Sequence, residues 1–338
     1  MNTPRATTRQ TTQGLWLGLL GIVIFSVTLP MTRMAVGSAD APQMSGFFIA
    51  MGRAVVAAVL SGGLLLLTRA PLPRRQDWLP LAITAGGVVF GFPLFTSIAM
   101  RYVDAMHASV IVGILPLATA AVGALLHRQR PSFSFWLCAG LGSTLVAVFA
   151  VMHGGATSTA ATTGGMSVHG ADLLLVAAML CAAVGYGYGA RLSQRMQPEH
   201  VICWALVMAL PLTLPLAAYH WPTVPVQNNA WWGFAYVAVF SMWLGFFAWY
   251  RGLALGGTVR VSQVQLVQPF LSMLVAVPLL GEKLDAVTVG FGVAVIATVF
   301  IGKKMPVSHN LLPPQTSTRS TPSTEPESKI HSLTENEA

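Results

Sequence analysis

Long apolar runs alternate with short polar segments along most of the chain. A transmembrane helix needs about 20 mostly apolar residues. Ten runs come close to or reach that length, and in chain order they cover residues 14–32, 44–67, 79–100, 104–126, 133–152, 170–190, 201–219, 231–250, 258–280 and 284–302. Of the formal charges, Arg53 alone lies well inside a run. The pattern predicts an all-α integral membrane protein with ten transmembrane helices.

The composition leads to the same interpretation. Hydrophobic residues make up 54% of the 338 positions and charged residues only 9%, whereas a soluble domain is about a quarter charged. The net charge of +8 lies in the short segments between the runs, so we expect a lipid bilayer and not nucleic acid as the partner. Cys138, Cys181 and Cys203 lie in apolar runs without metal-ligand spacing, so we expect no metal site.

The distribution of lysine and arginine predicts the orientation of the chain. If the N-terminus is cytoplasmic and the loops alternate, fifteen of these residues face the cytoplasm and three, Arg33, Arg101 and Lys283, face outward. Positive charge near span ends marks the cytoplasmic side. The first run also exceeds the roughly 7–15 residues of a signal-peptide core, so we expect it to stay uncleaved. We predict a multi-pass protein of the cell inner membrane with both termini in the cytoplasm.

Three segments lack long apolar runs. Residues 1–13 are polar, and residues 303–338 are rich in Ser, Thr, Pro and Glu. Such compositions bury too little apolar surface to offset the entropy cost of ordering, so we predict two disordered cytoplasmic tails. Residues 153–169 are mostly Gly, Ala, Ser and Thr, which predicts a flexible periplasmic linker. The linker separates a first set of five helices, 14–152, from a second set, 170–302.

The two sets resemble each other. Ser109 and Ser262 are separated by 153 residues, and so are Pro116 and Pro269. Five is an odd number, so the second set must cross the membrane in the opposite sense. Inverted repeats are typical of secondary transporters, whose substrate site lies near the midplane between the repeats. We therefore predict two inverted five-helix repeats.

Pro116 and Pro269 lie near the middle of the fourth and ninth runs. A proline inside a helix removes one backbone hydrogen bond and kinks the helix. Paired breaks at equivalent positions indicate a transporter's binding site, so we predict a helix-break or gating role. The alternative is that both prolines only shape the packing of their helices.

A polar stripe follows the ninth run. On a helical wheel, four polar side chains fall on the same face as Pro269, namely Ser262, Gln265, Gln268 and Ser272. Unpaired amides cost several kcal/mol in lipid, so the stripe must face protein or a cavity. The counterparts in the fourth run are Ser109, Val112, Leu115 and Thr119. We predict that the polar residues of both sets bind substrate; the alternative is hydrogen bonding between helices.

Aromatic residues form two further candidate walls. The eighth run places Trp243, Phe246, Phe247 and Tyr250 on one face, and the sixth run contains Tyr186 between two glycines. Aromatic walls suit organic substrates and cations, so Tyr186, Trp243 and Tyr250 are candidate substrate contacts. The alternative is that these rings only pack against lipid or neighbouring helices.

The few charged and titratable residues in or near the runs give little sign of proton-coupled transport. Arg53 costs roughly 2.5–3.5 kcal/mol at a helix centre; we expect a structural role, with Asp104 as the nearest candidate partner, and the alternative is binding a substrate carboxylate. We expect His107 to be an ordinary interfacial histidine. Asp104, Asp172 and Asp285 lie at outer ends of runs, where water reaches them. We therefore expect no membrane-embedded carboxylate to couple transport to protons.

Taken with the ten runs and the repeat, several short motifs resemble the EamA-type transporters of the drug/metabolite transporter superfamily. The motifs are Met51-Gly52-Arg53-Ala54, Leu115-Pro116-Leu117, Gln268-Pro269-Phe270 and Leu279-Leu280-Gly281-Glu282-Lys283-Leu284. Two positions depart from the family pattern: Phe25-Ser26 stands in place of Trp-Gly, and the turn at residues 127–130 lacks Gly-Glu. The resemblance implies a ten-helix inner-membrane carrier that exports small metabolites or amino acids.

The chain lacks the sequence motifs of common enzymes. It contains no His-Glu-x-x-His, no Gly-x-Ser-x-Gly and no P-loop. We therefore expect a transporter of a small-molecule substrate that works by alternating access and needs no cofactor, and a homodimer stays open as its assembly. The alternatives are an importer of a small organic solute or, in another class, a membrane-embedded enzyme or lipid-handling protein.

Overall fold

The computed structural model describes residues 8–126, 130–131, 168–257, 261–283, 285–304 and 307–308, together with isolated positions between 133 and 152. The chain divides into one unit of residues Met1–Ser308 and a second of residues His309–Ala338. Of the predicted linker 153–169, residues 153–167 lie outside the described residues and the last two residues begin a helix. The tail from residue 309 onward also lies outside them, and the predicted fifth run is described only in part.

Four of the predicted runs form single helices. These are α3 (Gly46–Leu67), α9 (Val168–Leu192), α10 (Pro198–Tyr219) and α15 (Ala286–Lys304). At the start of α3 the Ser45 Oγ accepts a hydrogen bond from the Phe48 N–H at 3.0 Å. This contact satisfies one of the backbone donors that a helix N-terminus leaves free.

Five other runs are built from two or more helical pieces. The first comprises α1 (Thr8–Ser26) and α2 (Thr28–Val36), and the third comprises η1 (Arg75–Asp77), α4 (Trp78–Ala85), the π-helix η2 (Gly86–Gly91) and α5 (Phe92–Ala99). The fourth comprises α6 (Ala105–Val112) and α7 (Leu115–Leu126). The eighth comprises α11 (Asn228–Tyr236), the π-helix η4 (Val237–Leu244) and α12 (Gly245–Gly256). The ninth comprises the 3₁₀-helix η5 (Ser262–Val267) and α14 (Gln268–Leu280).

Length and composition make much of this structure suitable for a membrane. Seven helical stretches within the described residues are long and apolar enough to cross one, and they fall on the first four runs and on the sixth, seventh and eighth. Two shorter apolar helices, Val264–Leu280 and Ala286–Thr298, fall on the ninth and tenth runs. The chain is a predominantly helical membrane protein.

Two details of the prediction are wrong. α1 begins at Thr8, so part of the predicted disordered tail 1–13 is helical, because extending an existing helix costs much less than nucleating one. Two short strands also pair in antiparallel fashion, β1 (Arg130–Pro131) with β2 (Val307–Ser308). The second strand lies in the predicted tail 303–338, and so do the last two residues of α15.

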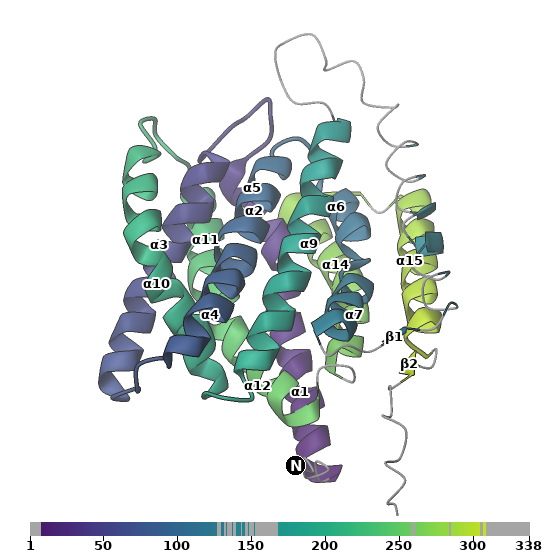
Figure 1. Cartoon of the computed structure of the whole chain (residues 1–338). Helices are drawn as coiled ribbons and strands as arrows, with labels where there is room; N and C mark the ends of the chain where they lie inside the picture. Colours follow the sequence, from purple (N-terminus) through teal and green to yellow (C-terminus); the bar gives the residue numbers. More distant parts are fainter. Residues whose placement is uncertain are drawn as a thin grey trace, which may run out of the picture. The chain divides into compact units, whose positions relative to one another are not determined.

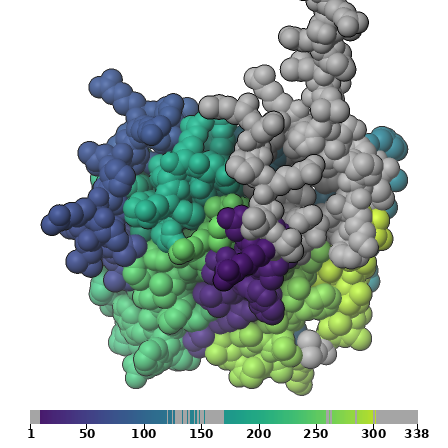
Figure 2. Space-filling view, turned by 90° about the horizontal axis from the view of Figure 1, so that it is seen from below, coloured from purple at the N-terminus to yellow at the C-terminus, as the bar shows by residue number. Residues whose placement is uncertain are grey.

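The helices pack mainly between the two halves of the chain. α3 packs on α10, α1 on α12, α4 and α5 on α9, and α6 on α14. Figure 1 shows α3 beside α10. In Figure 2 the dark purple α1 lies against green segments of the second half. Both halves therefore contribute to one core, whose largest fully buried side chains include Trp249, Arg53 and Tyr250.

Candidate functional site

The fourth and ninth runs are each interrupted just before their proline. α6 ends at Val112 and α7 begins at Leu115, with Pro116 as its second residue. The 3₁₀-helix η5 likewise gives way to α14, whose second residue is Pro269. Each proline is therefore the second residue of an α-helix that follows a change in backbone geometry, a position at which proline is well tolerated.

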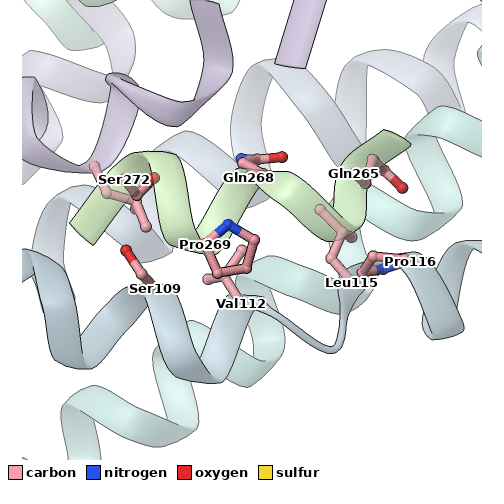
Figure 3. A pocket seen from close by; sticks show the side chains of 9 residues that line it. Ser109, Val112, Leu115, Pro116, Gln265, Gln268, Pro269 and Ser272 are labelled. Atoms are coloured by element: carbon pink, nitrogen blue, oxygen red, sulfur yellow. The ribbon is translucent and has the colours of Figure 1, made fainter. Parts of the chain in front are cut away.

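The two interruptions meet. A Cβ atom added to Gly113 would lie 3.3 Å from Cγ of Pro269, so the gap between α6 and α7 packs directly on the start of α14. Around this contact is a cavity, here called the proline pocket, lined by Leu29, Ser109, Val112, Leu115, Pro116, Gln265, Gln268, Pro269 and Ser272 (Figure 3). Its accessible volume is about 10 Å³, which is room for roughly one water molecule.

Three of the four predicted stripe residues line the proline pocket. In a 3₁₀-helix the side chains at i and i+3 eclipse each other, which aligns Gln265 with Gln268. Figure 3 shows Ser272 near Ser109 at one end of the pocket and Gln265 near Pro116 at the other. The fourth residue, Ser262, begins η5, but its side chain lies outside the described part of the structure.

Gln265 differs from Ser109 and Ser272 in its hydrogen bonding. The Ser109 hydroxyl donates to the Ala105 carbonyl at 2.7 Å, and the Ser272 hydroxyl donates to the Ser26 carbonyl. Gln265 is 1% exposed, and neither its amide nitrogen nor its amide oxygen has a hydrogen-bond partner among the described residues. A buried amide without partners is the side chain in this pocket best suited to bind a ligand.

A second cavity adjoins the first. This arginine pocket is lined by Phe25, Thr28, Leu29, Arg53, Val88, Phe92, Ala182, Tyr186, Ser241, Phe246 and Gln268. It shares Leu29 and Gln268 with the proline pocket. Its accessible volume is also about 10 Å³, so neither of these two pockets has room for a metabolite.

Arg53 has a different partner from the one predicted. Its Nη2 donates a hydrogen bond to the Ser241 Oγ at 2.9 Å, and that oxygen lies 2.9 Å from the Thr28 Oγ1. Asp104 instead accepts a hydrogen bond from Arg33 at 3.4 Å. The prediction failed because Arg53 faces the packed interior against η4, whereas the Asp104 side chain lies just before α6 and is 68% exposed.

The aromatic and hydroxyl candidates divide into two groups. Tyr186 lines the arginine pocket. Of the other described candidates, Trp243, Tyr250 and Thr119 line neither pocket. The Tyr250 hydroxyl donates to the Gly185 carbonyl at 3.4 Å, the Thr119 hydroxyl donates to the Leu115 carbonyl at 2.9 Å, and the Trp243 ring packs 5.0 Å from that of Phe247. The contacts of these three side chains are thus with neighbouring residues of the protein, away from the two pockets.

Several pocket residues were not predicted. Phe25, Thr28 and Leu29 come from the interruption between α1 and α2, and Pro30 lies in the first turn of α2. A third proline at a helix start is therefore the sequence signal for that interruption. Ser241 and Val88 come from the two π-helices, a conformation frequent at functional sites.

A third cavity lies at the ends of the helices. This loop pocket has an accessible volume of about 340 Å³, and its polar lining includes Arg33, Asp104, Glu282, Gln43 and Asn229. Glu282 accepts hydrogen bonds from the backbone N–H groups of Ala105 and Met106 at 2.8 and 2.9 Å, which cap α6. Burial raises the pKa of Glu282, and these two hydrogen bonds offset part of that increase.

The expectation that water reaches Asp172 is wrong. Its Oδ1 lies 2.6 Å from the His107 Nε2, and both side chains are nearly buried where α9 packs on α6. His107 is therefore part of a contact between the two halves. Within the described residues, no group of three or more His, Cys, Asp or Glu side chains is arranged to hold a metal ion.

Known proteins with similar sequences share most of this chain. An uncharacterized transporter, YdeK, of Bacillus subtilis (strain 168) is 42% identical over 299 residues, which cover 87% of this chain and 98% of that protein. The uncharacterized transporter YyaM of the same organism is 21% identical over 269 residues, 78% of this chain and 85% of that protein.

A solved structure and a family profile match as well. A crystal structure of another protein, 17% identical in sequence, superposes with a TM-score of 0.58 over 86% of this chain and 97% of its own, which shows a shared fold. The profile of the EamA-like transporter family matches residues 12–152 and 169–302. These matches confirm the resemblance inferred from the short motifs. The chain belongs to the EamA-like transporter family and is a membrane transporter rather than an enzyme.

Proposed function

We propose that this protein is a secondary transporter of the cell inner membrane that exports small metabolites or amino acids by alternating access. Its substrate site comprises the proline pocket and the arginine pocket. The observation that carries this proposal is the meeting of two interrupted runs, one from each half, at Pro116 and Pro269. Interrupted helices facing each other at a repeat interface are typical of substrate sites in secondary transporters.

The packing of the helices supports two inverted five-helix repeats, 14–152 and 170–302. The first run packs on the eighth and the third on the sixth, while the second packs on the seventh and the fourth on the ninth. Each run in the first half has a counterpart five places later in the second half, so that the first corresponds to the sixth and the third to the eighth. Replacing every run by its counterpart gives the same set of pairs. The two π-helices also lie in corresponding runs, the third and the eighth, and the family profile matches once in each half.

The sizes of the three cavities support alternating access. Each central pocket has an accessible volume of about 10 Å³, whereas that of the loop pocket is about 340 Å³. A metabolite therefore enters the centre only when helices move apart. The transition from η5 to α14 provides a hinge for this motion, since a 3₁₀ segment within a longer helix often marks one.

Metabolite profiling of cells with and without the gene tests the proposal. Expression of an exporter lowers the intracellular level of its substrate and raises the level in the medium. A change in the opposite direction would identify an importer. Identical metabolite profiles in the two strains, with the protein present in the membrane, would contradict the proposal.

A further inference from the structure

Arg53 introduces a positive charge into the centre of the fold without a carboxylate beside it. Its side chain is 1% exposed. The nearly buried or paired acidic residues that the structure describes are engaged elsewhere: Asp77 with Arg195, Asp104 with Arg33, Asp172 with His107, Glu199 with Arg251, and Glu282 with the start of α6. A buried charge is costly unless an opposite charge and hydrogen bonds compensate it.

The guanidinium of Arg53 also has unused donors. An arginine side chain has five N–H donors, and one hydrogen bond joins Nη2 to Ser241. Nε and Nη1 are buried and have no hydrogen-bond partner among the described protein groups. Arg53 itself lines the arginine pocket, so a molecule with acceptor oxygens bound there would offer partners to these donors.

The surrounding helices position the guanidinium. The Ser241 Oγ accepts from Arg53 and lies 2.9 Å from the Thr28 Oγ1, so α3, η4 and α2 are linked at this point. Ser241 lies in a π-helix. One extra residue in a helical turn rotates the following side chains by roughly 100° relative to an α-helix. The π-helix therefore sets which side chains of the eighth run face the pocket.

We infer that Arg53 binds the carboxylate of the transported molecule, so that the substrate is a small organic carboxylate with an apolar or aromatic body. This inference rests on the function proposed above. A carboxylate matches the single charge and the planar donors of a guanidinium. The rings of Phe25, Phe92 and Phe246 supply apolar walls for the rest of the molecule. A phosphate monoester carries about two charges and would leave one of them without a partner.

Release from proteoliposomes tests the inference. The full-length protein is reconstituted into vesicles filled with a bacterial cytosolic extract of small molecules, and released compounds are identified by mass spectrometry. We compare the wild type with Arg53→Gln, Arg53→Lys and the control Arg251→Gln, which removes an exposed arginine at the surface. Thermal unfolding in detergent measures stability in parallel.

We expect the released compounds to carry carboxylates. Arg53→Gln should reduce their release by about tenfold or more, Arg53→Lys should retain part of it, and Arg251→Gln should stay within about twofold of the wild type. Arg53→Gln should unfold at the same or a higher temperature, because it removes a buried charge that lacks a carboxylate partner.

Four outcomes would overturn the inference. If the compounds released lack carboxylates, or if Arg53→Gln releases them normally, the proposed function stands and the role of Arg53 is wrong. If both Arg53 variants lose their folded state, the arginine is structural. If the wild type releases nothing beyond empty vesicles, the proposed function and the inference fail together.

Discussion

At the scale of single residues, hydrogen bonding separates the polar candidates at the two pockets into satisfied and unsatisfied groups. Ser109, Ser272 and Thr119 are polar, but their hydroxyls donate to backbone carbonyls and are satisfied within the protein. Gln265 and Arg53 have buried polar atoms without partners among the described residues. Each such group costs about 1–3 kcal/mol, and a ligand that pairs with it recovers that energy on binding.

Replacing Gln265 by leucine tests this distinction. We expect transport to fall by about tenfold or more, because the amide supplies contacts made only to the substrate. Stability should stay the same or rise, since leucine removes unsatisfied buried donors and acceptors. Metabolite export and thermal unfolding measure the two effects, with Gln194→Leu at an exposed turn as the control. Unchanged export by both Gln265→Leu and Gln268→Leu would assign the stripe to packing.

At the scale of elements, the sequence predicts which runs are helical and where two of them change geometry, but not the local helix type. Apolar length identifies the runs, and the spacing of Pro116 and Pro269 identifies two of the interruptions. The π-helix η4 carries Ser241, whose partner Arg53 comes from a distant part of the chain. The hydrogen bond from Arg53 to Ser241 joins residues 188 positions apart, and no local pattern predicts such a pair.

Close contact between α1 and α12 depends on glycine. A Cβ atom on Gly252 would lie 2.7 Å from the backbone nitrogen of Gly18, so Gly252→Ala must push the two helices apart. We expect a loss of about 1–3 kcal/mol of stability, measured as a lower unfolding temperature in detergent. Gly62→Ala is the matched control, because a Cβ there meets nothing within 4 Å and alanine favours the helix. Equal unfolding temperatures for the two variants would contradict this account of the packing.

The cap that Glu282 forms on α6 predicts a pH dependence. Burial raises the pKa of Glu282 above its ordinary value of 4.5 despite the two backbone hydrogen bonds. A raised pKa in the folded state means that the stability contributed by Glu282 is complete below the unfolded pKa and is lost as pH rises through the folded one. The unfolding temperature of the wild type, measured relative to that of Glu282→Gln, should therefore fall as the pH is raised from about 4.5 to neutral. A difference that is constant with pH would refute this prediction.

At the scale of the whole molecule, contacts between the halves decide what becomes buried. Asp172 lies at the end of an apolar run, where the sequence predicts access to water. Packing of α9 on α6 buries it against His107 instead. The family resemblance could be inferred from the sequence because its motifs are short and local. The contact of Asp172 with His107, the arginine pocket and the cap from Glu282 form only when the two halves pack together.

The orientation of the molecule gives the last prediction. With fifteen lysines and arginines on one side of the ten proposed spans and three on the other, the linker 153–169 should face outward and the tail 303–338 the cytoplasm. In a variant without Cys138, Cys181 and Cys203, a membrane-impermeant maleimide should label Ser158→Cys in intact cells. It should label Ser317→Cys only after the membrane is opened. Labelling of both positions from the same side would mean an odd number of spans is missing or added, and the inverted relation of the two repeats would fail with it.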